Sequence, residues 1–457
     1  MRQRQFLILA LALSVAATIV LQRDFVDRFD GMMSTGFVDA PKNGRKNEPG
    51  VSPLVGGGGA QKYGRNRRVV LLGPHDRFNF GDLLFAKVVS RLLVTRAGYS
   101  PDEILHGGMV SIDMEGHGGP PTVLSMRTIS ELSQNAKEPY DIIFTGGEAL
   151  GCDHTCGIGM MMNDKLRAQA TREKIHECAY LFPKRLLLPQ NNTKNLTNIA
   201  VVNSMGGAST HAVCREAEDT ADYRAYRDKG PLYPDSAIMT KELFPDEIER
   251  GAREALGELG FADDQRFVAV QQFRIAEGIE LDLQLPELAL ALDQVARGMN
   301  ATVVFFAAGT CPGHDSYETY DRIKSLMKED AIVYYNGAHV WKVVGLVSRA
   351  SAVVSTSLHV RIMSFIHSKP RVTWCTGPKH KKFLELWDTK ESAPCFVGNK
   401  NQTWGLLQSR YLSNPDRARE TTASKYNKMV NLYLESFAKY STLLRPPMVA
   451  EEQQEKF

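Results

Sequence analysis

Short apolar runs that end at glycine or proline are the feature that most limits how this chain can fold. In the first half of the chain they lie at 69–72, 141–145 and 185–188. Such a run has no polar face, so it fits a strand buried on both sides of a parallel sheet. A helical pattern from Leu83 to Ala97 lies between the first two runs. We therefore predict a doubly wound α/β half in which strands and helices alternate.

The pattern restarts after an acidic helical stretch at 243–260, which reads as an inter-domain segment. Further strands are expected at 267–270, 302–306, 331–335, 352–355 and 371–374, with helices at 287–297 and 340–348. The prediction is two Rossmann-like halves, 67–250 and 260–457, in the glycosyltransferase-B-like arrangement, with C-terminal helices closing the second half. The active site is expected in the cleft between the halves, where the strands' carboxyl ends meet.

The first 66 residues predict a membrane anchor and a stem. Arg2 and Arg4 precede an uncharged, largely apolar run at 6–21, which as a helix would be about 24 Å long. A cleaved signal peptide and an uncleaved signal-anchor both fit. No clear small-x-small cleavage site follows the run, and a short span suits the thinner membranes of the early secretory pathway, so we favour the anchor, 1–21. Residues 22–66 read as a flexible stem. We therefore expect a single-pass type II protein of the Golgi or another secretory-pathway membrane, with its catalytic part in the lumen.

Glycosylation sequons agree with a lumenal location, although such triplets also arise by chance. They lie at Asn191, Asn195, Asn300 and Asn401. The composition is that of a globular protein, with 43% hydrophobic and 23% charged residues and a net charge of +3. No basic cluster interleaved with aromatic residues is present, so we expect no nucleic-acid partner.

The seven cysteines allow up to three disulfides and one free thiol in an oxidising compartment. Cys152 and Cys156 have the spacing of a metal half-site. No matching second Cys or His pair is present, so we expect no zinc. A local disulfide, or separate pairing to Cys178 or Cys214, is the better interpretation.

The segment from His75 to Asp82 is the first candidate site, because it follows the first predicted strand directly. Gly81 permits close backbone approach, and a helix that begins near Asp82 would present free N–H groups to an anion. A polar turn in which Asp82 merely caps the helix explains the same residues. Both interpretations stay open.

Two further candidates also follow predicted strands. Gly146, Gly147 and Glu148 come after the second strand, where paired glycines let a phosphate or sugar approach the backbone, although any tight turn can use them. His359 follows a late strand and precedes a helix, which suits proton transfer, with Arg361 about half a turn further on. A structural histidine beside a surface arginine is the alternative.

Taken in order, these segments resemble the polysaccharide pyruvyl transferase family. The resemblance rests on the motif at 79–82, the strand and Gly-Gly at 141–147, Arg215, the segment 234–237, and the motif at 353–361 with Pro370. Together they span roughly 68–375, most of the globular part. The order and spacing of the motifs carry the resemblance, since no single motif is specific.

The resemblance implies transfer of pyruvate from phosphoenolpyruvate to two hydroxyls of a sugar, as a cyclic ketal on a glycan or polysaccharide. It implies His359 as the acid that protonates the vinyl carbon, and Asp82 or Asp76 as the base for the sugar hydroxyl. No metal or cofactor is demanded. The remaining binding residues that it implies are Asn79, Gly81, Gly146, Gly147, Glu148, Arg215, Ser357, Leu358 and Arg361.

Two positions depart from the family pattern. Ser357 stands where the family usually has arginine before Leu-His, and Glu148 replaces a third glycine. An anion-binding guanidinium is therefore missing. Arg361 could reach the same place, and Arg215, Arg274 or Lys379 could compensate.

The departure at Ser357 keeps two other hypotheses open. The chain could be a nucleotide-sugar glycosyltransferase of the same architecture, which would need a nucleoside pocket in the second half. It could also be a non-catalytic, glycan-binding relative, because loss of a motif arginine is typical of a degenerate site.

Overall fold

The computed structural model describes residues 68–145, 199–201 and 234–444, which lie in one compact unit that spans 60–457. Within these ranges it leaves out 109, 126–127, 130–131, 133–140, 263, 274–278, 311–313, 375–377, 390–391 and 393–398. The predicted anchor and stem therefore lie outside the described residues. So do the strand expected at 185–188 and the cysteines at 152, 156, 178 and 214.

The first half contains a parallel sheet in the order β3-β2-β1-β4-β5. Its strands are β1 (Val69–Leu72), β2 (Ile104–Gly108), β3 (Val123–Ser125), β4 (Asp141–Phe144) and β5 (Ile199–Val201). β1 and β4 confirm the prediction, whereas β2, β3 and β5 were not expected. β2 was missed because its second half, His106-Gly107-Gly108, breaks the apolar run that marks a buried strand.

The second half contains a parallel sheet in the order β10-β9-β6-β7-β8. Its strands are β6 (Phe267–Gln271), β7 (Thr302–Phe306), β8 (Ala331–Tyr334), β9 (Ala352–Ser355) and β10 (Arg371–Thr373), and all of them were predicted. In both sheets the first strand is central and two strands are added to one side before the chain crosses to the other. The order thus reverses between β1 and β4 and between β6 and β9, and in folds of this class ligands bind beside such switch points.

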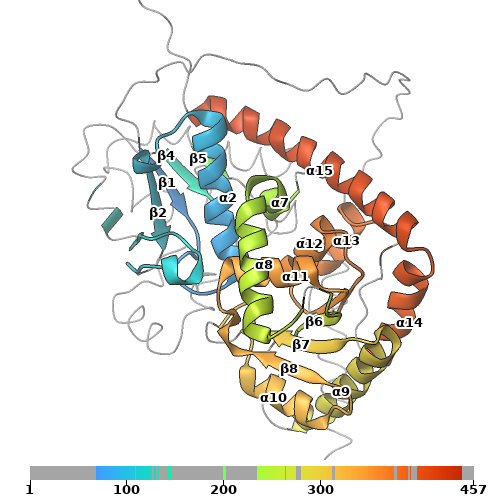
Figure 1. Cartoon of the computed structure of the whole chain (residues 1–457). Helices are drawn as coiled ribbons and strands as arrows, with labels where there is room; N and C mark the ends of the chain where they lie inside the picture. Colours follow the sequence, from blue (N-terminus) through green and yellow to red (C-terminus); the bar gives the residue numbers. More distant parts are fainter. Residues whose placement is uncertain are drawn as a thin grey trace, which may run out of the picture. The chain divides into compact units, whose positions relative to one another are not determined.

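Helices lie between strands, as the parallel order requires, and further helices follow the last strand (Figure 1). They are α2 (Phe80–Ala97), α7 (Thr240–Leu243), α8 (Pro245–Leu259), α9 (Ile279–Met299), α10 (Tyr317–Leu326), α11 (Val340–Arg349), α12 (Leu358–Ile366), α13 (Pro378–Leu386), α14 (Thr403–Leu407) and α15 (Pro415–Leu444). α2 begins after the cap Asn79 and ends at Gly98, whose φ of 71° is left-handed. The Asn79 cap fixes where the helix nearest the candidate site begins, and Gly98 fixes where it ends.

The acidic stretch that we expected to be an inter-domain segment is the helix α8, which packs tightly against α11 (Figure 1). The two helices approach through glycines. A Cβ on Gly251 would lie 2.2 Å from Trp341 O, and a Cβ on Gly345 would lie 2.3 Å from Ala252 N. Larger residues at either position would force the helices apart.

The last helix, α15, joins the core that contains the first sheet. Its Met429, Tyr433 and Phe437 belong to the same buried cluster as Val69 of β1 and Leu84 of α2. The C-terminal end of the chain therefore does not pack on the second sheet alone. The domain boundaries at 250 and 260 remain predictions.

The expected membrane topology needs correction. Among the described residues no helix is long and apolar enough to cross a bilayer. The single-pass type II topology, and with it the Golgi or secretory-membrane location, is therefore not supported. The expectation rested on the N-terminal run at 6–21, which lies outside the described residues.

Candidate active site

The turn between β1 and α2 is bonded to the loop that follows β7 in the other sheet. Phe80 N donates to Ala308 O over 2.9 Å, and Thr310 N donates to Phe78 O over 3.0 Å. Between these two bonds, Asn79 forms an isolated antiparallel bridge with Gly309. The N-terminus of α2 is thereby fixed at the carboxyl edge of the second sheet.

His359, the predicted acid, lies against this N-terminus. It is the second residue of α12, directly after β9, and its ring stands edge-on to Phe85 at a centroid distance of 5.0 Å. A Cβ on Gly81 would lie only 2.1 Å from His359 Nδ1. Gly81 is thus the residue that lets the imidazole rest on α2. The structure brings together two predicted site residues that are far apart in the chain.

Asp235 adds a carboxylate to His359. It caps the short helix η7 (Ser236–Met239), with Oδ1 accepting from Ala237 N over 2.8 Å. Its other oxygen, Oδ2, lies 3.7 Å from His359 Nε2. Both of these atoms are buried and lack a hydrogen-bond partner among the described residues. The segment 234–237 carried the family resemblance, but Asp235 was not predicted as a site residue.

The candidate bases lie in the same β1–α2 turn. Asp82 is buried in the first turn of α2. It is not the helix cap, because Asn79 Oδ1 accepts the capping bond from Gly81 N over 3.2 Å. Asp76 is half-buried, and its Oδ2 accepts from Val110 N over 3.0 Å. Both carboxylates remain candidate bases.

Arg77, which sequence reasoning missed, lies between the two candidate bases in the sequence. Two of its guanidinium nitrogens, Nε and Nη2, are buried without a hydrogen-bond partner in the part of the chain that the structure describes. A buried guanidinium normally binds a carboxylate or phosphate. The signal was its place at the carboxyl end of β1, at the switch point of the first sheet.

His75 marks this switch point. Its Nε2 lies 2.8 Å from Thr145 Oγ1, and the Thr145 hydroxyl itself donates to Leu72 O. The turn after β1 is thus tied to the end of β4. Burial lowers the pKa of His75 well below its usual value, and the positive charge of Arg77 lowers it further. His75 is therefore neutral near pH 7 and fits a structural role.

The switch point of the second sheet is built around Gln271, the last residue of β6. Its Oε1 accepts from Thr356 N over 3.1 Å and from Ser357 N over 2.9 Å. Its Nε2 donates to Asp315 Oδ1 over 2.7 Å. Burial raises the pKa of Asp315 to about 7. The side chain of Gln271 thus connects the turn that carries His359 to a carboxyl group that titrates near neutral pH.

Ser357 and Leu358 have structural roles at the start of α12. Ser357 is the helix cap, with its hydroxyl accepting from Val360 N over 3.4 Å, and Leu358 is buried in the core. An arginine at 357 would lose this cap. The departure from the family pattern therefore has a local reason.

Arg361 is bound within the protein. Its side chain is 0% exposed, Nε donates to Asp388 Oδ2 over 2.9 Å, and Nη1 donates to Thr373 Oγ1 over 2.9 Å. Arg371 binds the same carboxylate. The two guanidiniums hold the pKa of Asp388 far below its usual range. This geometry favours a structural role for Arg361 and gives no support to the idea that it replaces the missing arginine.

Several predicted site residues lie outside the described residues. They are Gly146, Gly147, Glu148, Arg215, Asn191, Asn195 and Arg274, and the side chain of Lys379 is not described either. Of the other two sequons, Asn300 and Asn401 are both exposed, and Asn300 has a positive φ of 48°. Their glycosylation remains a prediction.

Comparison with known families agrees with this arrangement. The model of the family described as polysaccharide pyruvyl transferase matches residues 61–373, which include both sheets from β1 to β10. The chain belongs to the polysaccharide pyruvyl transferase family. It is therefore a transferase, as predicted. A search of curated proteins found no match.

Solved structures to which the chain is similar include an epimerase and a heptosyltransferase. UDP-GlcNAc 2-epimerase from Neisseria meningitidis is 10% identical, with a TM-score of 0.41 over 82% of this chain and 100% of that one. The ADP-heptose LPS heptosyltransferase II of E. coli is 12% identical, with a TM-score of 0.36 over 81% of this chain and 99% of that one.

Proposed function

We propose that this transferase moves pyruvate from phosphoenolpyruvate to two hydroxyls of one sugar in a polysaccharide, forming a cyclic ketal. Membership of the family supports the reaction class. The observation that carries the proposal is the position of His359. Its ring rests on Gly81 at the carboxyl edges of the strands, with the Asp235 carboxylate beside it.

The reaction needs an acid and a base. In the first step a sugar hydroxyl adds to C2 of phosphoenolpyruvate, its proton passes to a base, and C3 gains a proton from an acid. In the second step the other hydroxyl attacks C2, loses its proton, and inorganic phosphate leaves. His359 is the proposed acid, and Asp82 or Asp76 is the proposed base. The Asp235 carboxylate would orient the imidazole and compensate its charge when it is protonated.

The donor carries a carboxylate and a phosphate, so the site must supply positive charge. We propose that Arg77 does so, in place of the arginine that is missing at 357. Its two unpartnered, buried nitrogens match a bidentate anion, and the N-terminus of α2 beside it adds the positive end of a helix dipole. Phosphate departure would be assisted by the same groups.

The experiment measures donor binding and turnover separately. Thermal shift with phosphoenolpyruvate, and with UDP as the competing ligand class, is applied to the wild type, Arg77→Gln and His359→Gln. A ligand at 100 times its Kd stabilises a protein by about 2.7 kcal/mol. Turnover is followed by phosphate release with a panel of oligosaccharides, and the ketal is identified by mass spectrometry of the acceptor.

We expect phosphoenolpyruvate to stabilise the wild type and His359→Gln, and to stabilise Arg77→Gln much less. His359→Gln should lose at least 100-fold in turnover, the usual size of a general-acid contribution. Stabilisation by UDP instead of phosphoenolpyruvate would support a nucleotide-sugar transferase. Stabilisation by neither ligand would point to a non-catalytic relative.

A further inference from the structure

A cavity of about 520 Å³ lies at the other end of the second sheet from His359. Its lining includes Phe267, the first residue of β6, and Lys369, which precedes β10. Because the strands are parallel, these residues mark the amino edge of the sheet, whereas His359 follows the carboxyl end of β9. The two ends of α12, at His359 and at its C-cap His367, are about 12 Å apart along the helix. The cavity is thus separate from the candidate active site.

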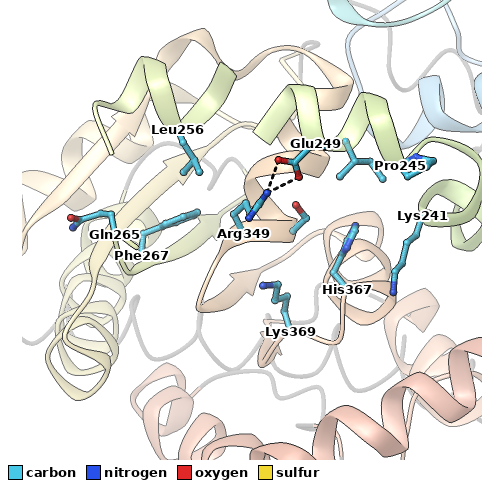
Figure 2. Close-up of a pocket in the computed structure, with 11 residues that line it drawn as sticks. Lys241, Pro245, Glu249, Leu256, Gln265, Phe267, Arg349, His367 and Lys369 are labelled. Carbon is cyan, nitrogen blue, oxygen red and sulfur yellow. Dashed lines mark hydrogen bonds and ion pairs between the residues drawn. The ribbon is translucent and has the colours of Figure 1, made fainter. Parts of the chain in front are cut away.

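Positive side chains dominate this cavity (Figure 2). Lys241, Arg349 and Lys369 line it together with His367, and the one carboxylate among the lining residues is Glu249. Glu249 is already bound by Arg349 Nη2, at 2.6 and 2.7 Å. Neither lysine has an ion pair among the described residues. The Lys241 ammonium lies 5.3 Å from the centre of the Tyr426 ring, a cation–π contact that does not neutralise its charge. Both lysines of the cavity therefore lack a counter-ion in the described part of the chain.

The pKa values of Lys369 and His367 reflect the excess of positive charge around the cavity. Burial and the neighbouring Arg349 and Arg419 lower the pKa of Lys369 to about 8. Burial, Lys241 and Lys369 lower the pKa of His367 to about 3, so its imidazole is neutral. The buried Nε2 of His367 has no hydrogen-bond partner in the described part of the chain. Lys369 is thus repelled by Arg349 and Arg419, and an anion bound in the cavity would relieve that repulsion.

Helix ends explain part of this pattern. Lys241 and Arg349 lie in the last turns of α7 and α11, where cations stabilise the free carbonyls. That role requires neither a shared cavity nor the buried, unpartnered nitrogen of His367. Lys369 lies beyond the last turn of α12, so it is not placed by the same rule.

We propose that this cavity binds a small phosphate ester with a hydroxyl-bearing body, such as a sugar phosphate. Lys241, Lys369 and His367 would bind the phosphate. Gln265 and Ser348, together with the Arg349–Glu249 pair, offer hydrogen-bonding groups for hydroxyls. The volume suits a molecule of that size. This second site goes beyond the proposed pyruvyl transfer.

Calorimetric titration of the full-length chain with glucose 6-phosphate, glucose and inorganic phosphate tests the proposal. We expect glucose 6-phosphate to bind, inorganic phosphate to bind more weakly, and glucose not to bind. The double variant Lys241→Gln/Lys369→Gln should weaken glucose 6-phosphate binding at least tenfold. Lys324→Gln removes an exposed lysine from the last turn of α10 and is the matched control, which should bind like the wild type.

Arg77→Gln separates this cavity from the candidate active site and should leave glucose 6-phosphate binding unchanged. Lys369→Arg keeps the charge and should retain binding within a few-fold. Thermal denaturation of the double variant, which should melt like the wild type, shows that its loss of binding is not a folding defect. Unchanged affinity in the double variant, an equal loss in Arg77→Gln, or no binding to the wild type would each overturn the proposal. None of these outcomes bears on phosphoenolpyruvate turnover, which is measured separately.

Discussion

The two strand-to-helix turns that meet at His359, β1–α2 and β9–α12, follow the same local design but use their arginines differently. Each turn ends in a capping side chain, Asn79 in one and Ser357 in the other. In the first turn Arg77 keeps two buried guanidinium nitrogens unpartnered among the described residues. After the second, Arg361 in the first turn of α12 is bound by Asp388 and Thr373.

This difference separates an arginine available to a ligand from one that holds the fold together. Both follow a buried strand by a few residues, so position in the sequence does not distinguish them. The distinction comes from partners: Asp388 neutralises Arg361 and Arg371 within the core, whereas no described carboxylate binds Arg77.

The largest effect is expected from Arg361→Ala. It removes one guanidinium from a fully buried ion pair, and breaking such a pair costs about 3 to 5 kcal/mol of folding stability. Chemical denaturation should show this loss directly. Phosphoenolpyruvate affinity of the fraction that remains folded should be unchanged.

Arg297→Ala is the matched control. Arg297 forms an exposed ion pair with Glu329, and such pairs contribute about 0 to 1 kcal/mol. If Arg361→Ala proved as mild as this control but weakened donor binding, Arg361 would belong to the donor site and the contrast between the turns would fail.

The same contrast shows what sequence could and could not predict. The strands of the second sheet were all predicted, four of them because they are mostly apolar runs, although β10 is Arg371-Val372-Thr373. By contrast, β2 ends in His106-Gly107-Gly108 and was missed. His359 and Gly81 were singled out as strand-end residues, but their contact requires the two halves to be folded together. Arg361 was expected to reach the donor site. Its structural role could not be seen in the sequence, because its partner, Asp388, lies 27 residues away and belongs to no motif.

A smaller effect, with a defined pH dependence, is expected at Asp315. This carboxyl group binds Gln271, which holds the β9–α12 turn, and burial raises its pKa to about 7. Its unfolded pKa is about 3.9. The folded state therefore holds a proton that the unfolded state has lost, and this stabilisation disappears as the pH rises through 7. Between pH 5 and pH 8 the free energy of unfolding should fall by roughly 2 to 3 kcal/mol from this group.

Asp315→Asn should remove that component, so that the stability difference between wild type and variant changes between pH 5 and pH 8 in favour of the variant at pH 8. Chemical denaturation at both pH values measures it. Asp330→Asn, at an exposed aspartate before β8, should leave the pH dependence as in the wild type. A parallel pH dependence in the wild type and Asp315→Asn would show that this carboxyl does not titrate near neutral pH.

The smallest effect concerns the two caps themselves. Ser357→Ala removes the cap of α12 and should cost about 1 kcal/mol of stability, the usual cost of losing an N-cap. Asn79→Ala should cost more, because it also removes the hydrogen bond that Asn79 Nδ2 donates to His314 Nε2 over 3.3 Å. Thermal denaturation of the two variants gives the order. Equal losses would mean that Asn79 acts only as a helix cap. A loss of phosphoenolpyruvate binding in Ser357→Ala beyond that in Asn79→Ala would instead place Ser357 in the donor site, as its family position implies.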